Sequence, residues 1–180
     1  MTVARAVWRQ VEAGDYGLMR RVNLWNAPRL LRGLMIAATR MGDGWLWAAT
    51  GVALLLFGGD VRYLAVAAGT LAACAGILIF SALKRTSRRK RPCDIMPHCW
   101  SAITPPDRYS FPSGHTIVAF AMVLSIGSFY PGLLFALLGV AMLIAISRIV
   151  LGMHFLSDVL AGAAIGVALG QMGFYFSHFL

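Results

Sequence analysis

The sequence predicts an all-α membrane protein, a polytopic helical bundle with about five transmembrane helices and an amphipathic interfacial region at the N-terminus. Composition is the first reason: the 180 residues are 59% hydrophobic and only 13% charged, whereas soluble domains are usually about 45–50% apolar. Mean hydropathy, at +0.72, is the second. The third is length, because five spans of roughly 20 residues and their connections fill the chain. We therefore expect a single domain over residues 1–180.

Residues 1–40 carry too many charges to cross a membrane and are expected to form interfacial helices. In the first, the apolar Ala4, Val7, Trp8 and Val11 recur at helical spacing opposite Arg5, Arg9 and Glu12. Asp15 is expected to cap a second helix, from Tyr16 to about Thr39. This region ends at the break Met41-Gly42-Asp43-Gly44.

Five apolar segments follow this break. Trp45 and Trp47, at the start of the first, are placed like interfacial anchors. The connection Gly59-Asp60-Val61-Arg62 is so short that the first two spans must form an antiparallel hairpin. In the last span, glycines at 162, 166 and 170 predict close approach by a neighbouring helix. The expected spans are about Gly44–Gly58, Tyr63–Leu83, Ser113–Tyr130, Leu133–Leu151 and Ser157–Phe176.

Three polar clusters interrupt this apolar chain, at residues 84–92, 111–115 and 147–158. Each span reverses the direction of the chain, so the loop after the second span, the start of the third and the connection from the fourth to the fifth emerge on one side of the membrane. The three clusters are therefore expected to meet on one face. Residues 84–158 form the predicted catalytic segment.

The first cluster contains six Lys and Arg residues in eight positions. Most are typical of a juxtamembrane basic patch that binds anionic lipid and sets topology. Lys84 and Arg91 are candidates for a different task. Arg offers a planar fork of donors and Lys a point charge, a usual combination for holding a phosphoryl group.

The second cluster, Pro112-Ser113-Gly114-His115, is placed to begin a helix. Ser113 is a favourable cap, the free backbone N–H groups of a first helical turn bind anions, and Gly114 would let an oxygen approach the backbone. Alone, this cluster is equally well explained as a plain helix cap with an interfacial histidine.

The third cluster places Arg148 within an apolar run, where a charge is costly and suggests function unless it snorkels to the interface. His154 and Asp158 are four residues apart and share a face if a helix begins near His154. The Asp158 carboxylate can then accept the Nδ1–H of His154 and leave Nε2 as a neutral nucleophile. His115, a second histidine on the same face, can protonate a leaving oxygen.

This set predicts phosphoryl transfer through a phosphohistidine, without a cofactor and without a metal, since it contains no carboxylate cluster for a metal ion. Cys74, Cys93 and Cys99 predict no disulfide framework, and the spacing of the last two fits no standard zinc pattern. A local Cys93–Cys99 disulfide remains an alternative if the loop faces an oxidising compartment.

The three clusters resemble the motifs of the type 2 phosphatidic acid phosphatases (PAP2), which share a site with the vanadium haloperoxidases. The family's K-x6-RP, PSGH and SR-x5-H-x3-D read here as Lys84 to Pro92, Pro112 to His115, and Ser147 to Asp158, with every spacing kept. The resemblance implies that His154 is the nucleophile, Asp158 its orienting partner and His115 the general acid. It also implies that the phosphate is held by Lys84, Arg91, Ser113, Gly114 and Arg148. The family usually has six spans, so its first span is reduced or replaced here.

The expected function is that of a membrane lipid phosphatase acting on phosphatidate, phosphatidylglycerophosphate or a polyprenyl diphosphate. A lipid phosphotransferase with the same site is the alternative. A vanadium-dependent haloperoxidase is disfavoured by the five apolar spans, and a membrane scaffold or channel does not explain the spacing of His154 and Asp158. The expected partners are the lipid phosphate substrate and membrane lipids, not nucleic acid.

The 16 Lys and Arg residues against 7 Asp and Glu give a formal charge of +9, which favours anionic lipid surfaces and phosphate groups. Arg62 is the single basic residue expected on the face opposite the site. The positive-inside rule therefore predicts a cytoplasmic site. The resemblance instead implies an enzyme of the bacterial inner membrane with an outward-facing site, and this alternative stays open.

Overall fold

The computed structural model describes residues 3–25, 28–96, 107–177 and 179, and over these residues it contains helices and no strand. The predicted all-α class is confirmed. The helices are α1 (Val3–Leu24), α2 (Arg29–Met41), α3 (Trp45–Phe57), α4 (Arg62–Ser87), α5 (Pro92–Ile95), α6 (Gly114–Phe129), α7 (Pro131–Val150) and α8 (Leu156–Ser177).

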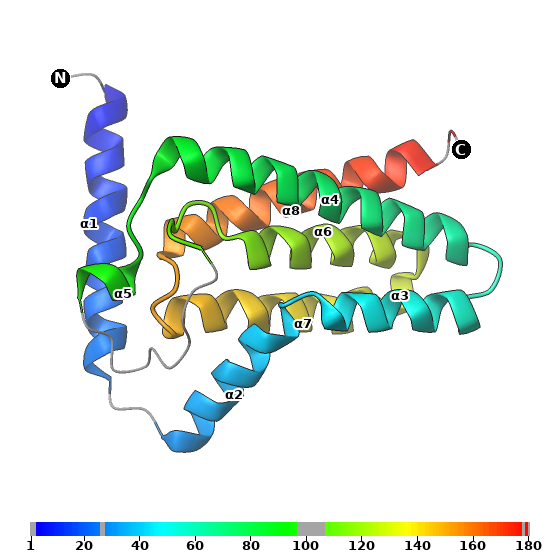
Figure 1. Cartoon of the computed structure of the whole chain (residues 1–180), viewed down its shortest axis with the longest axis horizontal. Coiled ribbons are helices and arrows are strands. Elements are labelled where there is room, and N and C mark those ends of the chain that lie inside the picture. The colour runs from blue at the N-terminus through cyan, green and yellow to red at the C-terminus, as the bar shows by residue number, and fades with distance from the viewer. Residues whose placement is uncertain (1–2, 26–27, 97–106, 178, 180) are drawn as a thin grey trace.

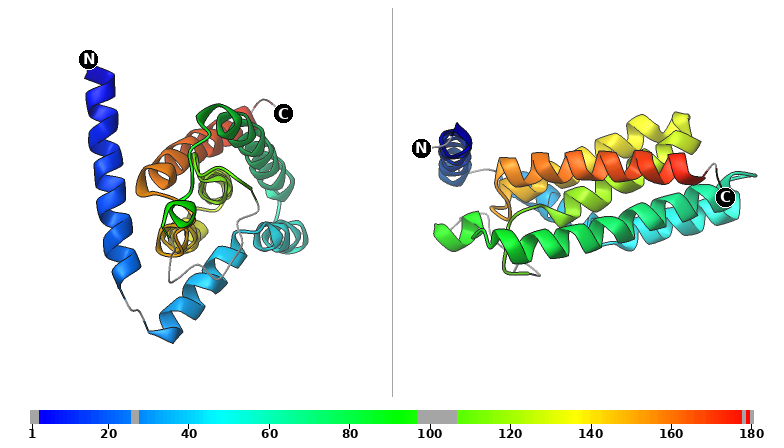
Figure 2. Two further views of the ribbon diagram at one scale, coloured as in Figure 1. Left: turned by 60° about the vertical axis from the view of Figure 1, so that its left-hand side comes forward. Right: turned by 90° about the horizontal axis from the view of Figure 1, so that it is seen from above.

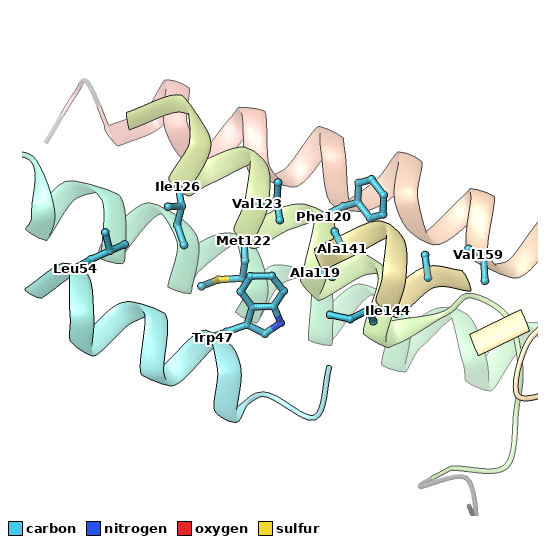
Figure 3. Close-up of a cluster of buried hydrophobic side chains, with 11 residues drawn as sticks. Trp47, Leu54, Ala119, Phe120, Met122, Val123, Ile126, Ala141, Ile144 and Val159 are labelled. Carbon is cyan, nitrogen blue, oxygen red and sulfur yellow. The ribbon is translucent and has the colours of Figure 1, made fainter. Parts of the chain in front are cut away.

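Five apolar helices, α3, α4, α6, α7 and α8, run side by side as one bundle (Figure 1). α6 is its central helix, and the end-on view in Figure 2 shows it surrounded by the others. A helix that is apolar on all sides is buried rather than amphipathic. The α6 residues Ala119, Val123 and Ile126 are accordingly almost completely buried and belong to the main core cluster (Figure 3).

The predicted close approach along the glycines of α8 is confirmed. A Cβ at Gly162 would lie 2.8 Å from the backbone oxygen of Ser113, and one at Gly166 would lie 2.5 Å from that of Ile117. α8 therefore packs directly on the backbone of α6. Since Ser113 lies at the N-terminal end of α6 and Asp158 in the first turn of α8, this contact also brings the second and third polar clusters together.

The expected spans agree with the observed helices to within a few residues, with differences at their ends. α4 continues to Ser87, so Lys84 lies in its last turn rather than in a loop. A short helix, α5, was not expected in the polar segment. Trp47 is not an interfacial anchor, because it is only 5% exposed and packs in the core with Met122 (Figure 3). Trp45 is exposed and donates from Nε1 to the carbonyl oxygen of Arg40 at 2.8 Å.

The N-terminal region differs from the expectation of two helices divided at Asp15. α1 is continuous across this position and lies across one end of the bundle, where the view from above shows it nearly end-on (Figures 1 and 2). Asp15 caps no helix. Its carboxylate accepts from the backbone N–H and the hydroxyl of Ser157 at the start of α8. A tertiary contact, which local sequence does not reveal, decides its role.

Three of the described helical segments are long and apolar enough to cross a membrane. They are the segment Arg62–Ile95, which contains α4, and the helices α7 and α8. α3 and α6 are apolar but shorter, with 13 and 16 residues. The protein is an integral membrane protein, and the count of five spans stays a prediction. The α3–α4 and α6–α7 turns meet at one end, where the Tyr130 hydroxyl donates to the carbonyl oxygen of Gly58 at 2.9 Å. The polar clusters lie at the other end.

Candidate active site

A cavity of about 380 Å³ opens at the end of the bundle that carries the polar clusters. Five of the predicted site residues line it: Lys84, Gly114, His115, Arg148 and His154. The other three, Arg91, Ser113 and Asp158, contact these residues or their neighbours. The predicted convergence of the three clusters is confirmed. The remaining lining residues are Gly42, Asp43, Gly44, Ile77, Phe80, Asp107 and Val118.

His154 lies in the connection between α7 and α8 and is 2% exposed. Its backbone N–H and that of Met153 both donate to the carbonyl oxygen of Arg148, which turns the chain back towards the end of α7. Nη1 of Arg91 is 3.2 Å from Nε2 of His154, and Nη2 of Arg148 is 3.5 Å from it. A guanidinium only donates, so Nε2 must accept, and the ring proton belongs on Nδ1. This is the tautomer that a nucleophilic Nε2 requires.

Asp158 is completely buried behind His154. Its Oδ2 accepts from the backbone N–H of Phe155 at 2.9 Å and lies 3.8 Å from Nδ1 of His154. The expected hydrogen bond from His154 is therefore not formed, because 3.8 Å is too long. Among the described residues Nδ1 has no hydrogen-bond partner. The carboxylate nonetheless faces the protonated nitrogen.

The start of α6 differs in detail from the expectation for Ser113 and Gly114. Ser113 occupies the cap position, but its side chain makes no capping hydrogen bond within the described structure and instead accepts from the Thr116 hydroxyl at 2.9 Å. Its backbone N–H donates to the carbonyl oxygen of Asp158 at 3.1 Å. Gly114 packs beneath the Phe80 ring, which a Cβ would approach to 3.0 Å. This contact supplies a packing reason for glycine.

Burial divides the basic cluster as expected for Lys84 and Arg91. These two are 6% and 1% exposed, whereas Arg85, Arg88 and Lys90 are exposed. Arg89, which was grouped with the topology-setting cations, is the exception. Its guanidinium donates to Asp158 at 2.6 Å and to Asp15 at 2.7 Å, so it joins α1 to the acid behind His154.

Asp107 is a site residue that the sequence did not indicate. Its carboxylate accepts from Nζ of Lys84 at 2.6 Å and from Nη2 of Arg91 at 2.8 Å. Burial alone would raise the pKa of Asp107, but the hydrogen bonds and charges of Lys84 and Arg91 hold it below its usual range. The ionised carboxylate therefore neutralises two cations that a phosphate would use.

Asp43 and Thr39, from the α2–α3 region, also reach the site unexpectedly. Asp43 Oδ1 is 2.9 Å from Nε2 of His115, and the Thr39 hydroxyl accepts from Nη1 of Arg148 at 2.6 Å. The polar break around Asp43 was visible in the sequence. Its distance of 72 residues from His115 gave no sign that the two meet.

The electrostatic setting favours an uncharged His154. Complete burial, and then the charges of Arg148 and Arg91, hold its pKa well below the usual 6.5. Within the described residues, no three side chains among His, Cys, Asp and Glu gather in a group that could hold a metal ion. The Cys93–Cys99 alternative involves Cys99, which lies outside the described residues.

The fold and this arrangement define a membrane enzyme site built for an anion. The chain belongs to the PAP2 superfamily, whose family model matches residues 62–180. The resemblance drawn from the three motifs is thus confirmed. The region before residue 62, including α1, α2 and Asp43, lies outside that match.

Two curated relatives are similar to parts of the chain. A lipid A 1-phosphatase of Porphyromonas gingivalis is 44% identical over 75 residues, 39% of this chain and 17% of that protein's length. A decaprenylphosphoryl-5-phosphoribose phosphatase of Mycobacterium tuberculosis is 35% identical over 129 residues, which cover 72% of this chain and 69% of that protein's length. The chain thus spans only a small part of the first relative.

The fold is similar to the crystal structure of a transmembrane PAP2 type phosphatidylglycerolphosphate phosphatase from Bacillus subtilis. The TM-score is 0.74 with 22% sequence identity, and the alignment covers 95% of this chain and 88% of the other. At this identity the likeness supports the fold alone.

Proposed function

We propose that the protein is an integral membrane lipid phosphatase, which hydrolyses a phosphomonoester or diphosphate of a lipid through a phosphohistidine at His154. The observation that carries this proposal is the setting of Nε2 of His154. This nitrogen is unprotonated and belongs to a ring that lines the cavity, with the guanidinium groups of Arg91 and Arg148 3.2 and 3.5 Å away. A neutral nucleophile surrounded by phosphate-binding donors is what phosphoryl transfer needs.

In the first step, Nε2 of His154 attacks phosphorus, the bond from phosphorus to the lipid oxygen breaks, and His115 gives that oxygen a proton. The imidazole becomes positively charged as the P–N bond forms. Asp158, already facing Nδ1, stabilises this charge, and its 3.8 Å separation is expected to shorten in the substrate complex. Arg89 and the Phe155 N–H hold the carboxylate in place.

In the second step, water attacks phosphorus, His115 takes the proton from water, and the P–N bond breaks to release inorganic phosphate. The phosphoryl oxygens are held by Lys84, Arg91 and Arg148, with the N–H of Gly114 and the hydroxyl of Ser113 as further donors. Lys84 and Arg91 now pair with Asp107. Substrate phosphate must therefore take over donors that this carboxylate occupies.

The apolar part of the cavity supports a lipid substrate. Ile77 and Phe80 from α4 and Val118 from α6 continue the lining towards the apolar bundle. An alkyl or prenyl chain attached to a phosphate at His154 thus meets apolar side chains instead of water. The names of the two relatives, both phosphatases of lipid-linked substrates, support the same class.

The experiment is a phosphate-release assay on the detergent-solubilised protein across phosphatidate, phosphatidylglycerophosphate and a polyprenyl diphosphate. We expect one or more of these to release inorganic phosphate, and His154→Ala to lower the rate on the order of 10³-fold or more. Full activity of a folded His154→Ala variant would refute the mechanism. Lipid dephosphorylation without inorganic phosphate would indicate transfer to another acceptor.

A further inference from the structure

The turn between α2 and α3 contributes three residues to the cavity that have no role in the proposed reaction. Gly42, Asp43 and Gly44 all line the cavity. They precede residue 62, where the family match begins, so the motifs that define the family do not account for them. A polar turn at this point has to be explained from its own contacts.

Asp43 binds the proposed general acid directly. Its Oδ1 lies 2.9 Å from Nε2 of His115, and its Oδ2 lies 3.3 Å from Nη1 of Arg40. The Arg40 cation favours the ionised carboxylate, which can only accept hydrogen bonds. Nε2 of His115 must therefore carry a hydrogen, and Nδ1 becomes the nitrogen that is free to exchange a proton with substrate.

The backbone of the turn restricts the same ring. A Cβ at Gly42 would lie 2.7 Å from Cδ2 of His115 and 3.1 Å from Cγ2 of Ile144. The imidazole thus rests against the glycine backbone and leaves no room for a side chain there. Gly44, with φ of +101°, lets the chain turn from Asp43 into α3. Packing and a hydrogen bond act together on His115.

His115 lies among positive charges, which the negative charge of Asp43 offsets. Lys84 from α4, Arg148 from α7 and His154 line the same cavity, and Asp107 on its rim is already paired with Lys84 and Arg91. Asp43 is the carboxylate that contacts His115 itself. Burial and the cations oppose protonation of this ring, and the Asp43 carboxylate in contact with it counteracts them in favour of the protonated form, which is the form that a general acid must have.

We propose that Asp43 is a positioning residue for the general acid: its carboxylate holds the Nε2–H of His115 and thereby directs Nδ1 to the leaving oxygen. Nδ1–H gives its proton to that oxygen as the bond to phosphorus breaks, and the same nitrogen accepts a proton when water attacks the phosphohistidine. Asp43 exchanges no proton with substrate. This inference rests on the proposed function, because it assigns a helper to one of its steps.

The test compares two leaving groups in single-turnover reactions, which report the first chemical step alone. Dioleoyl phosphatidate releases an alkoxide that needs a proton, whereas p-nitrophenyl phosphate releases a stable phenolate that does not. Loss of general acid catalysis costs about 10²–10⁴-fold, so His115→Ala should lose about this much with phosphatidate and far less with p-nitrophenyl phosphate. This variant is the reference for the test.

We expect Asp43→Asn to show the same contrast at smaller size, about 10- to 100-fold slower with phosphatidate and within about threefold of wild type with p-nitrophenyl phosphate. Asp43→Glu, which keeps the charge, should recover part of the phosphatidate rate. Asp60→Asn is the matched control at the opposite end of the bundle and should leave both rates unchanged.

An equal loss with both substrates in Asp43→Asn would mean a structural role and overturn the inference, as would an unchanged phosphatidate rate. If instead His115→Ala itself fails to distinguish the leaving groups, or His154→Ala stays active, it is the proposed function that fails. The two failures are therefore distinguishable.

Discussion

At the scale of single residues, the site places the proposed nucleophile, an uncharged His154, among a group of cations. Arg91 and Arg148 both point donors at Nε2 of His154, which fixes the tautomer and also opposes protonation of the ring. Arg148 has a further buried nitrogen, Nε, without a partner among the described residues. An unpaired donor on Arg148 is consistent with its proposed role of donating a hydrogen bond to a phosphoryl oxygen of the substrate.

The pH profile of catalysis should follow this balance. Burial, and then the charges of Arg148 and Arg91, hold the pKa of His154 well below 6.5. Since the neutral imidazole is the active form, activity is present above this pKa and is lost as the pH falls through it. We expect the acid limb of kcat/KM that belongs to His154 to lie below pH 6.5.

Arg148→Met removes one of the opposing charges and should move this acid limb to higher pH, while Arg148→Lys keeps the charge and should leave the limb in place. Both variants are expected to lose activity, because Arg148 is also proposed to bind phosphate, so the position of the limb is the measurement. Comparing the variants on one substrate cancels the titration of its own phosphate. An identical limb in wild type and Arg148→Met would contradict the electrostatic account.

At the scale of helices, contact between α6 and α8 sets the distance between the two histidines, His115 and His154, that are proposed to be catalytic. The glycines at 162, 166 and 170 let α8 lie on the backbone of α6. The Ser113 N–H then reaches the carbonyl oxygen of Asp158. A side chain at any of these three glycines would meet the backbone of α6 and is therefore expected to separate the second cluster from the third.

Gly166→Ala should therefore lower thermal stability and activity together. A Cβ there would lie 2.5 Å from the backbone oxygen of Ile117 and 2.8 Å from Cβ of Phe120, and neither atom belongs to the flexible end of a side chain. We expect a loss of about 1–3 kcal/mol, typical of overpacking in a core. Gly139→Ala in α7 is the matched control, since a Cβ at Gly139 meets nothing within 4 Å. Equal melting temperatures for the two variants in detergent would contradict this packing.

α1 is joined to the site by the buried carboxylate of Asp15. This group accepts from Arg89 and from Ser157, and Arg89 also holds Asp158. α1 is thus connected to Asp158, the acid that faces the proposed nucleophile. The same contact explains why Asp15 does not divide the N-terminal region into two helices.

Asp15→Ala leaves Arg89 and the Ser157 N–H without this acceptor, which costs about 1–3 kcal/mol for buried polar groups. We expect the variant to unfold at a lower temperature and to lose activity as Asp158 becomes less well held. Glu12→Gln, which changes a partly exposed carboxylate on the same helix, is the control. Wild-type stability and rate in Asp15→Ala would show that α1 is not connected to the site in this way.

At the scale of the whole molecule, the helical bundle and most residues of the candidate site could be predicted from the sequence. Alternating span direction alone placed Lys84, His115 and His154 at one end, because helices of this length allow little else. The contacts of Asp43, Asp107 and Asp15 at the site were not predicted, for one shared reason. Each meets its partner through tertiary packing over long separations, such as 72 residues between Asp43 and His115, and no local pattern encodes such contacts. The prediction of Trp47 as an interfacial anchor was wrong, because a tryptophan near the start of a helix is compatible with both a membrane interface and a protein core.

The positions of the cations predict an orientation of the molecule in the membrane. Arg62 begins α4 at the end opposite the site, and the exposed Arg85, Arg88 and Lys90 lie at the end that carries it. The positive-inside rule then predicts a cytoplasmic site. A cysteine introduced by Arg62→Cys, in a background without native cysteines, should react with a membrane-impermeant thiol reagent in intact cells. Labelling that requires permeabilised cells would place the site on the outer face.

His154 is proposed to carry the phosphoryl group between the two steps of the reaction. In His115→Ala supplied with p-nitrophenyl phosphate, the first step needs no proton, but the second loses its general base. We therefore expect a burst of p-nitrophenol equal to the amount of enzyme, and an acid-labile phosphate that mass spectrometry locates on His154. Continued turnover with no covalent phosphate on His154, or phosphate on another residue, would contradict the account.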